Sequence, residues 1–241
     1  MLKTARIMPV IAAVCIMMIP SAVQAGKWFP SHRTARSLIG LRIGYNMASF
    51  AQVDHLDLFQ RGTVPGIPDE KTSPGFGCGI FGYIPLRGAL GLRFEIAYTT
   101  KGGEYEVTDY GDGSVYTFRF RTAYIENALL LEVRVPFGGL HTGAFLGPYF
   151  ARLMSGDIEL KHLGSNQYSY FGNYKKFDYG VTYGARLEIP LGRTVLLCDV
   201  RFSIGFTDIL EKPIRFTYEE WKRIKPNLKN SVLALGVGIS L

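Results

Sequence analysis

The stretch 177–206 constrains the fold most, because it holds two alternating segments joined by a short connection. In residues 177–189 the odd positions are apolar or aromatic, whereas the even positions are small, polar or charged. Residues 194–206 alternate again, and Pro190-Leu191-Gly192-Arg193 connects the two segments. Successive side chains of a strand point to opposite faces, so each segment predicts a strand with one apolar and one polar face. A connection this short allows only a hairpin.

The same alternation recurs along the chain and predicts eight strands in all. Their residue ranges are 38–49, 75–86, 90–101, 115–135, 142–154, 177–189, 194–206 and 231–241. Within 115–135 the apolar phase shifts near Arg121–Ala123, which predicts a β-bulge in this strand. With that shift, Phe118 and Phe120 would share the outer apolar face with Ile125 and Leu129.

Short and long connections alternate between the predicted strands. The short ones, 84–88, 135–139 and 189–193, each place a proline before a glycine, which ends strand pairing and forms a tight turn. The long ones cover residues 50–74, 102–114, 155–176 and 208–230. This arrangement predicts an up-and-down sheet with three tight turns and both chain ends on one rim and four long loops on the other.

The distribution of charge separates a membrane barrel from a soluble one. A soluble lipocalin-like barrel would be apolar inside and polar outside, whereas a transmembrane barrel faces lipid with its apolar side. Here Arg, Glu and Asp share one face with glycine, which suits the narrow interior of an eight-stranded barrel. The sequence therefore predicts an all-β fold, an eight-stranded antiparallel transmembrane barrel with periplasmic turns and outer loops.

The first residues differ from the rest and predict export. Lys3 and Arg6 precede an apolar run that ends in Ser21-Ala22-Val23-Gln24-Ala25, the pattern of a cleaved signal peptide over residues 1–25. The alternative, a short membrane anchor, would need a longer apolar run. Residues 26–37 would form a flexible lead-in and residues 38–241 the barrel domain. Loss of Lys3 and Arg6 would lower the net charge from +7 to +5, and the expected location is the outer membrane.

Several short motifs resemble the PorT-like outer-membrane β-barrel domain family of Bacteroidetes and related bacteria. The matching stretches, in the order of the family, are 98–103 (YTTKGG), 124–126 (YIE), 147–149 (GPY), 177–180 (FDYG) and 201–209 (RFSIGFTDI). The resemblance implies an integral barrel of the OmpA/OmpX type in the cell envelope and no defined activity. One branch of the family is similar to a component of a protein-secretion system.

The charges on the inward phase are the main candidate functional feature. They are Arg42, Arg93, Glu95, Glu126, Glu132, Arg134, Asp178, Arg186, Glu188, Asp199 and Arg201. They could form an ion path or gate, or a salt-bridge network that plugs the barrel. An unpaired charge in a narrow interior is costly, which favours the plug. Arg186 and Asp199, predicted to be neighbours across the hairpin, should then form an ion pair.

Other residue patterns give weaker indications. Tyr83, Tyr98, Tyr149, Tyr179 and Phe206 lie near predicted strand ends and predict an aromatic belt at the membrane surface, or else ligand stacking. Residues 217–224 resemble a capped helix whose Trp221, Lys222 and Arg223 could contact lipopolysaccharide or a protein partner, or pack within the loop. Cys78 and Cys198 are expected to be free thiols.

Three classes of function follow from these patterns. The favoured class is a monomeric structural, binding or secretion-associated module that acts through its outer loops. The alternative is a small porin for ions or solutes, although aqueous channels have 16 to 18 strands. An enzyme is disfavoured, because the sequential proximity of Asp157, His162 and Ser165 is no diagnostic spacing. No cofactor, metal or nucleic acid is expected.

Overall fold

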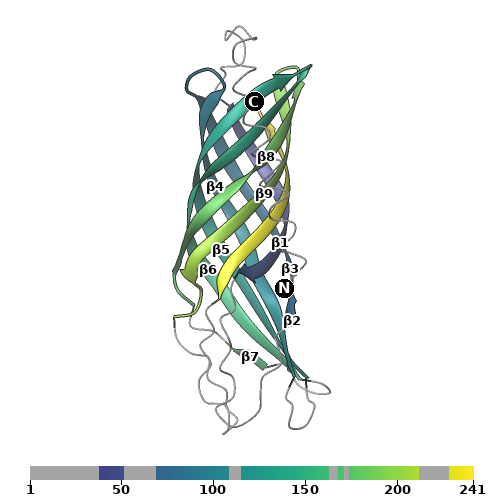
Figure 1. Cartoon of the computed structure of the whole chain (residues 1–241), viewed down its shortest axis with the longest axis vertical. Helices are drawn as coiled ribbons and strands as arrows, with labels where there is room; N and C mark the ends of the chain where they lie inside the picture. Colours follow the sequence, from purple (N-terminus) through teal and green to yellow (C-terminus); the bar gives the residue numbers. More distant parts are fainter. Residues whose placement is uncertain (1–37, 52–68, 109–114, 163–167, 171–173, 212–227) are drawn as a thin grey trace.

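Eight long strands form the wall of a barrel in the computed structural model of the chain (Figure 1). The structure describes residues 38–51, 69–108, 115–162, 168–170, 174–211 and 228–241. The long strands are β1 (Leu38–Ala51), β3 (Ser73–Pro85), β4 (Leu90–Thr108), β5 (Val115–Phe137), β6 (Leu140–His162), β8 (Phe177–Leu191), β9 (Thr194–Asp208) and β10 (Lys229–Ser240). Two three-residue strands, β2 (Asp69–Lys71) and β7 (Tyr168–Tyr170), lie outside this wall.

Pairing of the first and last strands closes the sheet. Each long strand pairs antiparallel with the next long strand along the chain, and β1 pairs with β10 from Gly40–Ser240 to Ala51–Lys229. The predicted eight-stranded, antiparallel up-and-down barrel is therefore confirmed. The predicted leader and lead-in lie outside the described residues. The described part of the chain contains no helix that could cross a membrane.

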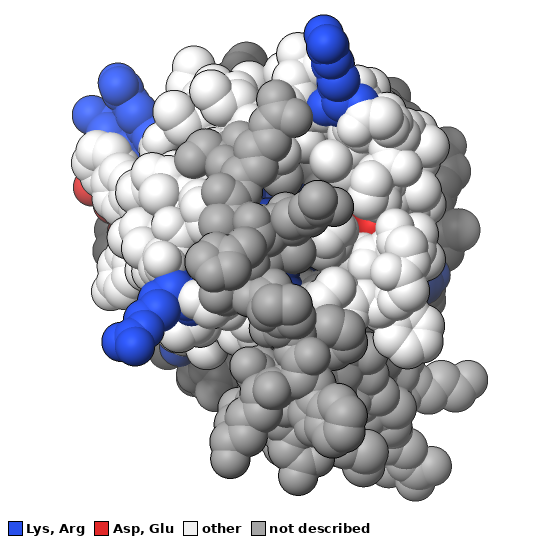
Figure 2. Space-filling view, turned by 90° about the horizontal axis from the view of Figure 1, so that it is seen from above, with Lys and Arg blue, Asp and Glu red and all other residues white. Residues whose placement is uncertain are grey.

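The three tight turns lie together at one rim, as the proline–glycine pattern predicts. Gly88, Gly138 and Gly192 have φ values of 61°, 62° and 67°, a left-handed conformation that disfavours any other residue. The described ends of the chain meet at the same rim, where the Leu241 amide donates to the Ile39 carbonyl over 3.1 Å. Viewed from this end, the molecule shows mostly uncharged side chains with a few projecting Lys and Arg side chains (Figure 2).

The outer wall is apolar and the inner wall is charged, which reverses the arrangement of a soluble protein. Exposed outer residues come from every long strand and include Ile43, Phe94, Leu131, Leu146 and Val237. Aromatic pairs lie on this wall towards the long loops: Phe76 with Tyr98, Phe150 with Phe177, and Tyr179 with Phe206. Tyr83 and Tyr149, which were predicted for the aromatic belt, are instead buried inside the barrel.

Three strands continue beyond the barrel and correct the predicted loops. β4 has 19 residues and β5 and β6 have 23 each, whereas the other long strands have 12 to 15. Much of the expected loops 102–114 and 155–176 is thus strand. β2 pairs with the extended part of β4, and β7 pairs with that of β6. These segments form a sheet that projects from the long-loop rim (Figure 1).

The ladder has an irregularity next to Ala123, where a bulge was predicted, but the extra residue lies in the neighbouring strand, and the predicted outward orientation of Phe118 and Phe120 was wrong. The register between β5 and β6 shifts where Ala123 pairs with Ser155 and Tyr124 with Leu153, so the extra residue is Met154 on β6. Phe118 and Phe120 are buried, with exposed fractions of 6% and 2%. The reason is physical: beyond the lipid, the outside of the sheet meets water, so aromatic side chains turn inward and charged ones outward.

Candidate functional site: a paired charge network inside the barrel

All eleven predicted inward charges lie on the inner face. Ten of them are buried and Arg134 is partly buried. Lys101, buried at 5% exposure, joins them and was not among the predicted network. The interior of the described barrel then holds six cations (Arg42, Arg93, Lys101, Arg134, Arg186 and Arg201) and six anions (Glu95, Glu126, Glu132, Asp178, Glu188 and Asp199). The formal charges balance.

Two bidentate arginine–carboxylate pairs occupy the middle of the barrel. Arg42 donates to both oxygens of Asp199 over 2.7 and 2.8 Å. Arg201 donates to both oxygens of Glu95 over 2.7 and 3.0 Å. Arg93 forms a further ion pair with Glu95, and Arg201 lies 3.5 Å from Asp199. Parallel bonds of this kind fix the orientation of both partners, so they tie β1 to β9 past β10 and β9 to β4 across the lumen.

Gly236 makes room for one of these pairs. Arg42 is on β1 and Asp199 on β9, so the arginine must cross β10, which lies between them. A Cβ atom on Gly236 would lie 2.5 to 2.7 Å from the guanidinium group of Arg42. Other bulky inner side chains also lie over a glycine of a neighbouring strand: Tyr83 lies over Gly91 and Phe145 over Gly184. Glycine on the inner wall thus lets long side chains reach past a neighbouring strand.

A second cluster lies nearer the short-turn rim. Arg186 Nη1 is 3.1 Å from a Glu132 oxygen and 3.4 Å from a Glu188 oxygen, and Arg134 forms an ion pair with Glu188. Aromatic rings also lie against these cations: Arg93 is 4.3 Å from the Phe81 ring centre and Arg134 is 4.4 Å from that of Tyr83. Carboxylates and aromatic faces therefore offset the cost of burying these guanidinium groups.

Lys101 organises a third cluster near the long-loop rim. Its Nζ atom is 2.7 Å from Glu126 and 3.5 Å from Asp178. Asp178 also accepts hydrogen bonds from Tyr149 at 3.1 Å and Asn230 at 3.0 Å. The alternation of residues 90–101 placed Lys101 on the inner phase. The sequence did not predict Lys101 as part of the charge network, because it was the last residue of the predicted strand 90–101. In the structure β4 continues to Thr108.

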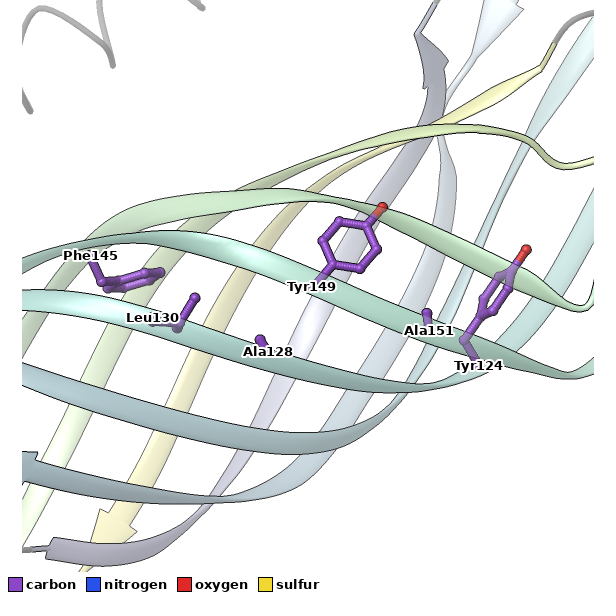
Figure 3. Close-up of a cluster of buried hydrophobic side chains, with 6 residues drawn as sticks. All are labelled: Tyr124, Ala128, Leu130, Phe145, Tyr149 and Ala151. Carbon is purple, nitrogen blue, oxygen red and sulfur yellow. The ribbon is translucent and has the colours of Figure 1, made fainter.

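Packed apolar side chains accompany the charges on β5 and β6. Tyr124, Ala128, Leu130, Phe145, Tyr149 and Ala151 form one buried cluster (Figure 3). Further along, Phe50 and Phe120 meet edge to face with ring centres 5.6 Å apart. Ile158, Tyr174, Ile209, Leu210 and Leu228 are also buried at this end. Buried apolar side chains thus accompany the charges along the interior and gather at its long-loop end.

The projecting sheet carries charged residues on its outer face. Arg119 pairs with Glu104 and lies 3.6 Å from Glu159, while Arg121 also approaches Glu159 at 3.7 Å. The hydrogen bond from Arg119 to Glu104 raises the pKa of the guanidinium above its ordinary value. Lys71 on β2 extends the ladder to Glu106 on β4 over 2.5 Å. These cross-strand pairs follow the register of β2, β4, β5 and β6.

The remaining candidate residues lie apart on one strand or outside the described part of the chain. Asp157 and His162 are five positions apart on one strand, β6, which separates them by roughly 16 Å. Ser165 and the candidate loop residues Trp221, Lys222 and Arg223 lie outside the described residues. Among the residues that the structure describes, no group of three or more His, Cys, Asp or Glu side chains could hold a metal ion. Cys78 and Cys198 are free thiols.

Comparison with known proteins identifies a family and similar structures. The sequence model of the family described as "Outer membrane protein beta-barrel domain" matches residues 24–211. No curated protein matches the chain.

Three solved outer-membrane proteins illustrate the structural likeness. OprG from Pseudomonas aeruginosa is 12% identical, with 86% of this chain and 95% of that chain covered and a TM-score of 0.47. Neisserial surface protein A is 12% identical, with 84% and 97% covered and a TM-score of 0.38. Ail, the attachment invasion locus protein of Yersinia pestis, solved with a heparin analogue, is 13% identical, with 86% and 99% covered and a TM-score of 0.35.

Proposed function

The chain belongs to the family of outer membrane protein β-barrel domains, and from that premise we propose that it is a plugged barrel that binds a partner at its long-loop rim. The balanced interior is the observation that carries this proposal. Six cations and six anions share a narrow lumen, and the two bidentate pairs join β1 to β9 past β10 and β9 to β4 on the opposite wall. A lumen filled in this way fixes the wall rather than conducting solutes.

The charge pattern distinguishes this role from that of a small porin. A selective pore presents an excess of one sign to the passing ion. Here the formal charges cancel, and Arg93 and Glu132 have no exposed surface. Opening a path would require breaking several buried ion pairs, each of which leaves an uncompensated charge. The apolar layer around Phe120, Ile158 and Leu228 adds a second barrier at the mouth.

The proposed orientation places the short-turn rim in the periplasm. In barrels of this kind the periplasmic turns are short and the extracellular loops are long. The signal-peptide pattern of residues 1–25 provides the export route. We propose a monomer, because a closed wall has no free edge along the barrel. Membership of the PorT-like group, with a role in the envelope or in secretion, is the finer assignment that the motifs favour.

The projecting sheet is the proposed binding element. It presents the ladder of Lys71, Glu106, Glu104, Arg119 and Glu159 on one face, at the end of the molecule farthest from the turns. A face with alternating charges suits a protein partner of complementary pattern rather than a polyanion. The proposed activity is binding, and catalysis has no part in it.

Planar-bilayer recording tests the plug directly. We expect the purified mature chain to give no stable unitary current. Stable currents that vanish in Arg93→Ala or Arg201→Ala would instead favour a porin. Location is tested separately, by fractionation and by gel mobility before and after boiling; release by osmotic shock without a heat-dependent shift would contradict an integral barrel.

Partner binding is tested on intact cells by cross-linking and mass spectrometry. A photoreactive residue at Thr117, on the outer face of the projecting sheet, should capture an envelope or surface protein. The matched control is the same probe at Gly139, on the short-turn rim. Equal capture at both positions would contradict a binding role for the long-loop end.

A further inference from the structure

A groove of about 390 Å³ crosses the outer wall over β4, β5 and β6. It is lined by three consecutive residues of each strand, and in each run the first and last side chains face outward: residues 94–96, 127–129 and 148–150. Asn127 and Pro148 lie between larger neighbours, with Phe94 and Ile96 on one side and Phe150 on the other. The groove exists because two compact side chains stand where most of this wall carries large ones. Its walls are apolar and exposed, so in a membrane they contact acyl chains.

Asn127 gives the groove a polar feature. It is exposed on the apolar wall and its side chain makes no hydrogen bond among the described residues. Polar side chains facing a bilayer are costly and therefore seek a hydrogen-bonding partner. In the ladder Asn127 is opposite Phe150, whose ring stacks on Phe177 with centres 5.2 Å apart. Aromatic residues of this kind mark the membrane interface, where the carbonyl groups of lipids are available as acceptors.

Two exposed cations lie just beyond the groove. Arg152 follows Phe150 by two residues on β6, which places it on the same face about 7 Å further along the strand towards the long-loop rim. The exposed Lys176 directly precedes Phe177, the residue opposite Arg152 in the ladder, and its carbonyl accepts a hydrogen bond from the Leu153 amide over 2.8 Å. Neither cation forms an ion pair with an acidic residue in the described part of the chain. Both are therefore available to an external anion.

We propose that this surface binds one phosphorylated glycolipid, the lipid A part of lipopolysaccharide. An acyl chain occupies the groove, Asn127 donates to the carbonyl that links this chain to the sugar, and Arg152 and Lys176 bind a phosphate. The order of apolar groove, amide and cations along the wall matches the order of groups in such a lipid. The inference goes beyond the proposed function and shares with it only the orientation that places the long-loop rim in the outer leaflet.

Native mass spectrometry of the full mature chain in detergent tests the proposal, with bisphosphorylated lipid A as the probe. We expect one tightly retained lipid per barrel. Removal of a surface cation near lipid headgroups weakens binding roughly fivefold, so Arg152→Gln with Lys176→Gln should weaken it by about 25-fold. Asn127→Phe should also weaken binding because it fills the groove. The matched control is Arg87→Gln with Arg193→Gln, two exposed cations of the opposite rim.

Three further outcomes decide the identity of the lipid. Dephosphorylated lipid A should bind as weakly to the native chain as lipid A does to the double variant. Equal binding of phosphatidylglycerol, or an unchanged affinity in the double variant, would overturn the proposal. Folding is checked in each variant by the shift in gel mobility on boiling. A conducting barrel that still binds lipid A would contradict the plug but leave this site intact.

Discussion

Arg186 and Asp199 lie directly opposite each other in the ladder between β8 and β9, yet each forms its ion pairs with other residues. Arg186 contacts Glu132 on β5 and Glu188 on its own strand. Asp199 binds Arg42 of β1 through two hydrogen bonds. The predicted pairing of these two neighbours was therefore wrong. The space above Gly236 lets Arg42 reach past β10 to Asp199, where two parallel charge-assisted hydrogen bonds favour this pair over the neighbour in the ladder.

Double-mutant cycles should show that Asp199 is coupled energetically to Arg42 and not to Arg186. Arg42→Ala or Asp199→Ala alone should cost about 3–5 kcal/mol in the free energy of unfolding, because each leaves a buried charge uncompensated. The double variant should lose clearly less than the sum. For Arg186 and Asp199 the losses should be nearly additive, within about 0.5 kcal/mol. Urea unfolding in detergent micelles measures all five variants; equal coupling in both cycles would contradict the assigned pairs.

Substitution of Gly236 should disturb the same pair without touching a charge. In Gly236→Ala the new methyl group meets the guanidinium of Arg42, and moving the latter breaks its bonds to Asp199. The expected loss is about 1–3 kcal/mol, as for overpacking elsewhere. Gly82→Ala, on the outer phase of β3, has no atom within 4 Å of the new group and should be neutral or slightly stabilising. Relative to the native chain, the denaturant concentration at the unfolding midpoint should therefore fall in Gly236→Ala and stay unchanged or rise slightly in Gly82→Ala.

Lys101 should prove essential to the stability of the long-loop end. Lys101→Met keeps the length of the side chain but leaves Glu126 and Asp178 without their cation, at a cost of about 3–5 kcal/mol. Lys71→Met removes an exposed pair with Glu106 and should cost about 0–1 kcal/mol. Chemical denaturation followed by tyrosine and tryptophan fluorescence compares them. Similar losses in both variants would argue against a special role for the buried lysine.

Two adjacent glycines test the tight turn between β5 and β6. Gly138 has a φ of 62° and Gly139 has no left-handed backbone, while neither would bring a new methyl group near another atom. Gly138→Ala should therefore cost about 1–2 kcal/mol through backbone strain alone. Gly139→Ala should be nearly neutral. The rate of folding into lipid vesicles, read from gel mobility, should fall only in the first variant.

The alternation of side chains determined which face each barrel residue takes. It placed Arg42, Arg93 and Glu132 inside and Ile43, Phe94 and Leu131 outside, because a strand has only two faces. The proline–glycine turns determined which strands are adjacent, since a short connection allows only a hairpin. From these local rules followed the eight-stranded barrel and eleven of the twelve charges in its interior.

Only the tertiary structure decided which charges pair and where the barrel ends. Pairing of Arg42 with Asp199 depends on the closure of β1 onto β10 and on the space above Gly236, and both are relations between distant parts of the chain. The burial of Phe118 and Phe120 depends on where lipid gives way to water. In lipid the apolar face of a strand points outward, whereas in water it points inward. Periodicity is a local property of a strand, whereas lumen contacts and the surrounding solvent are properties of the closed wall.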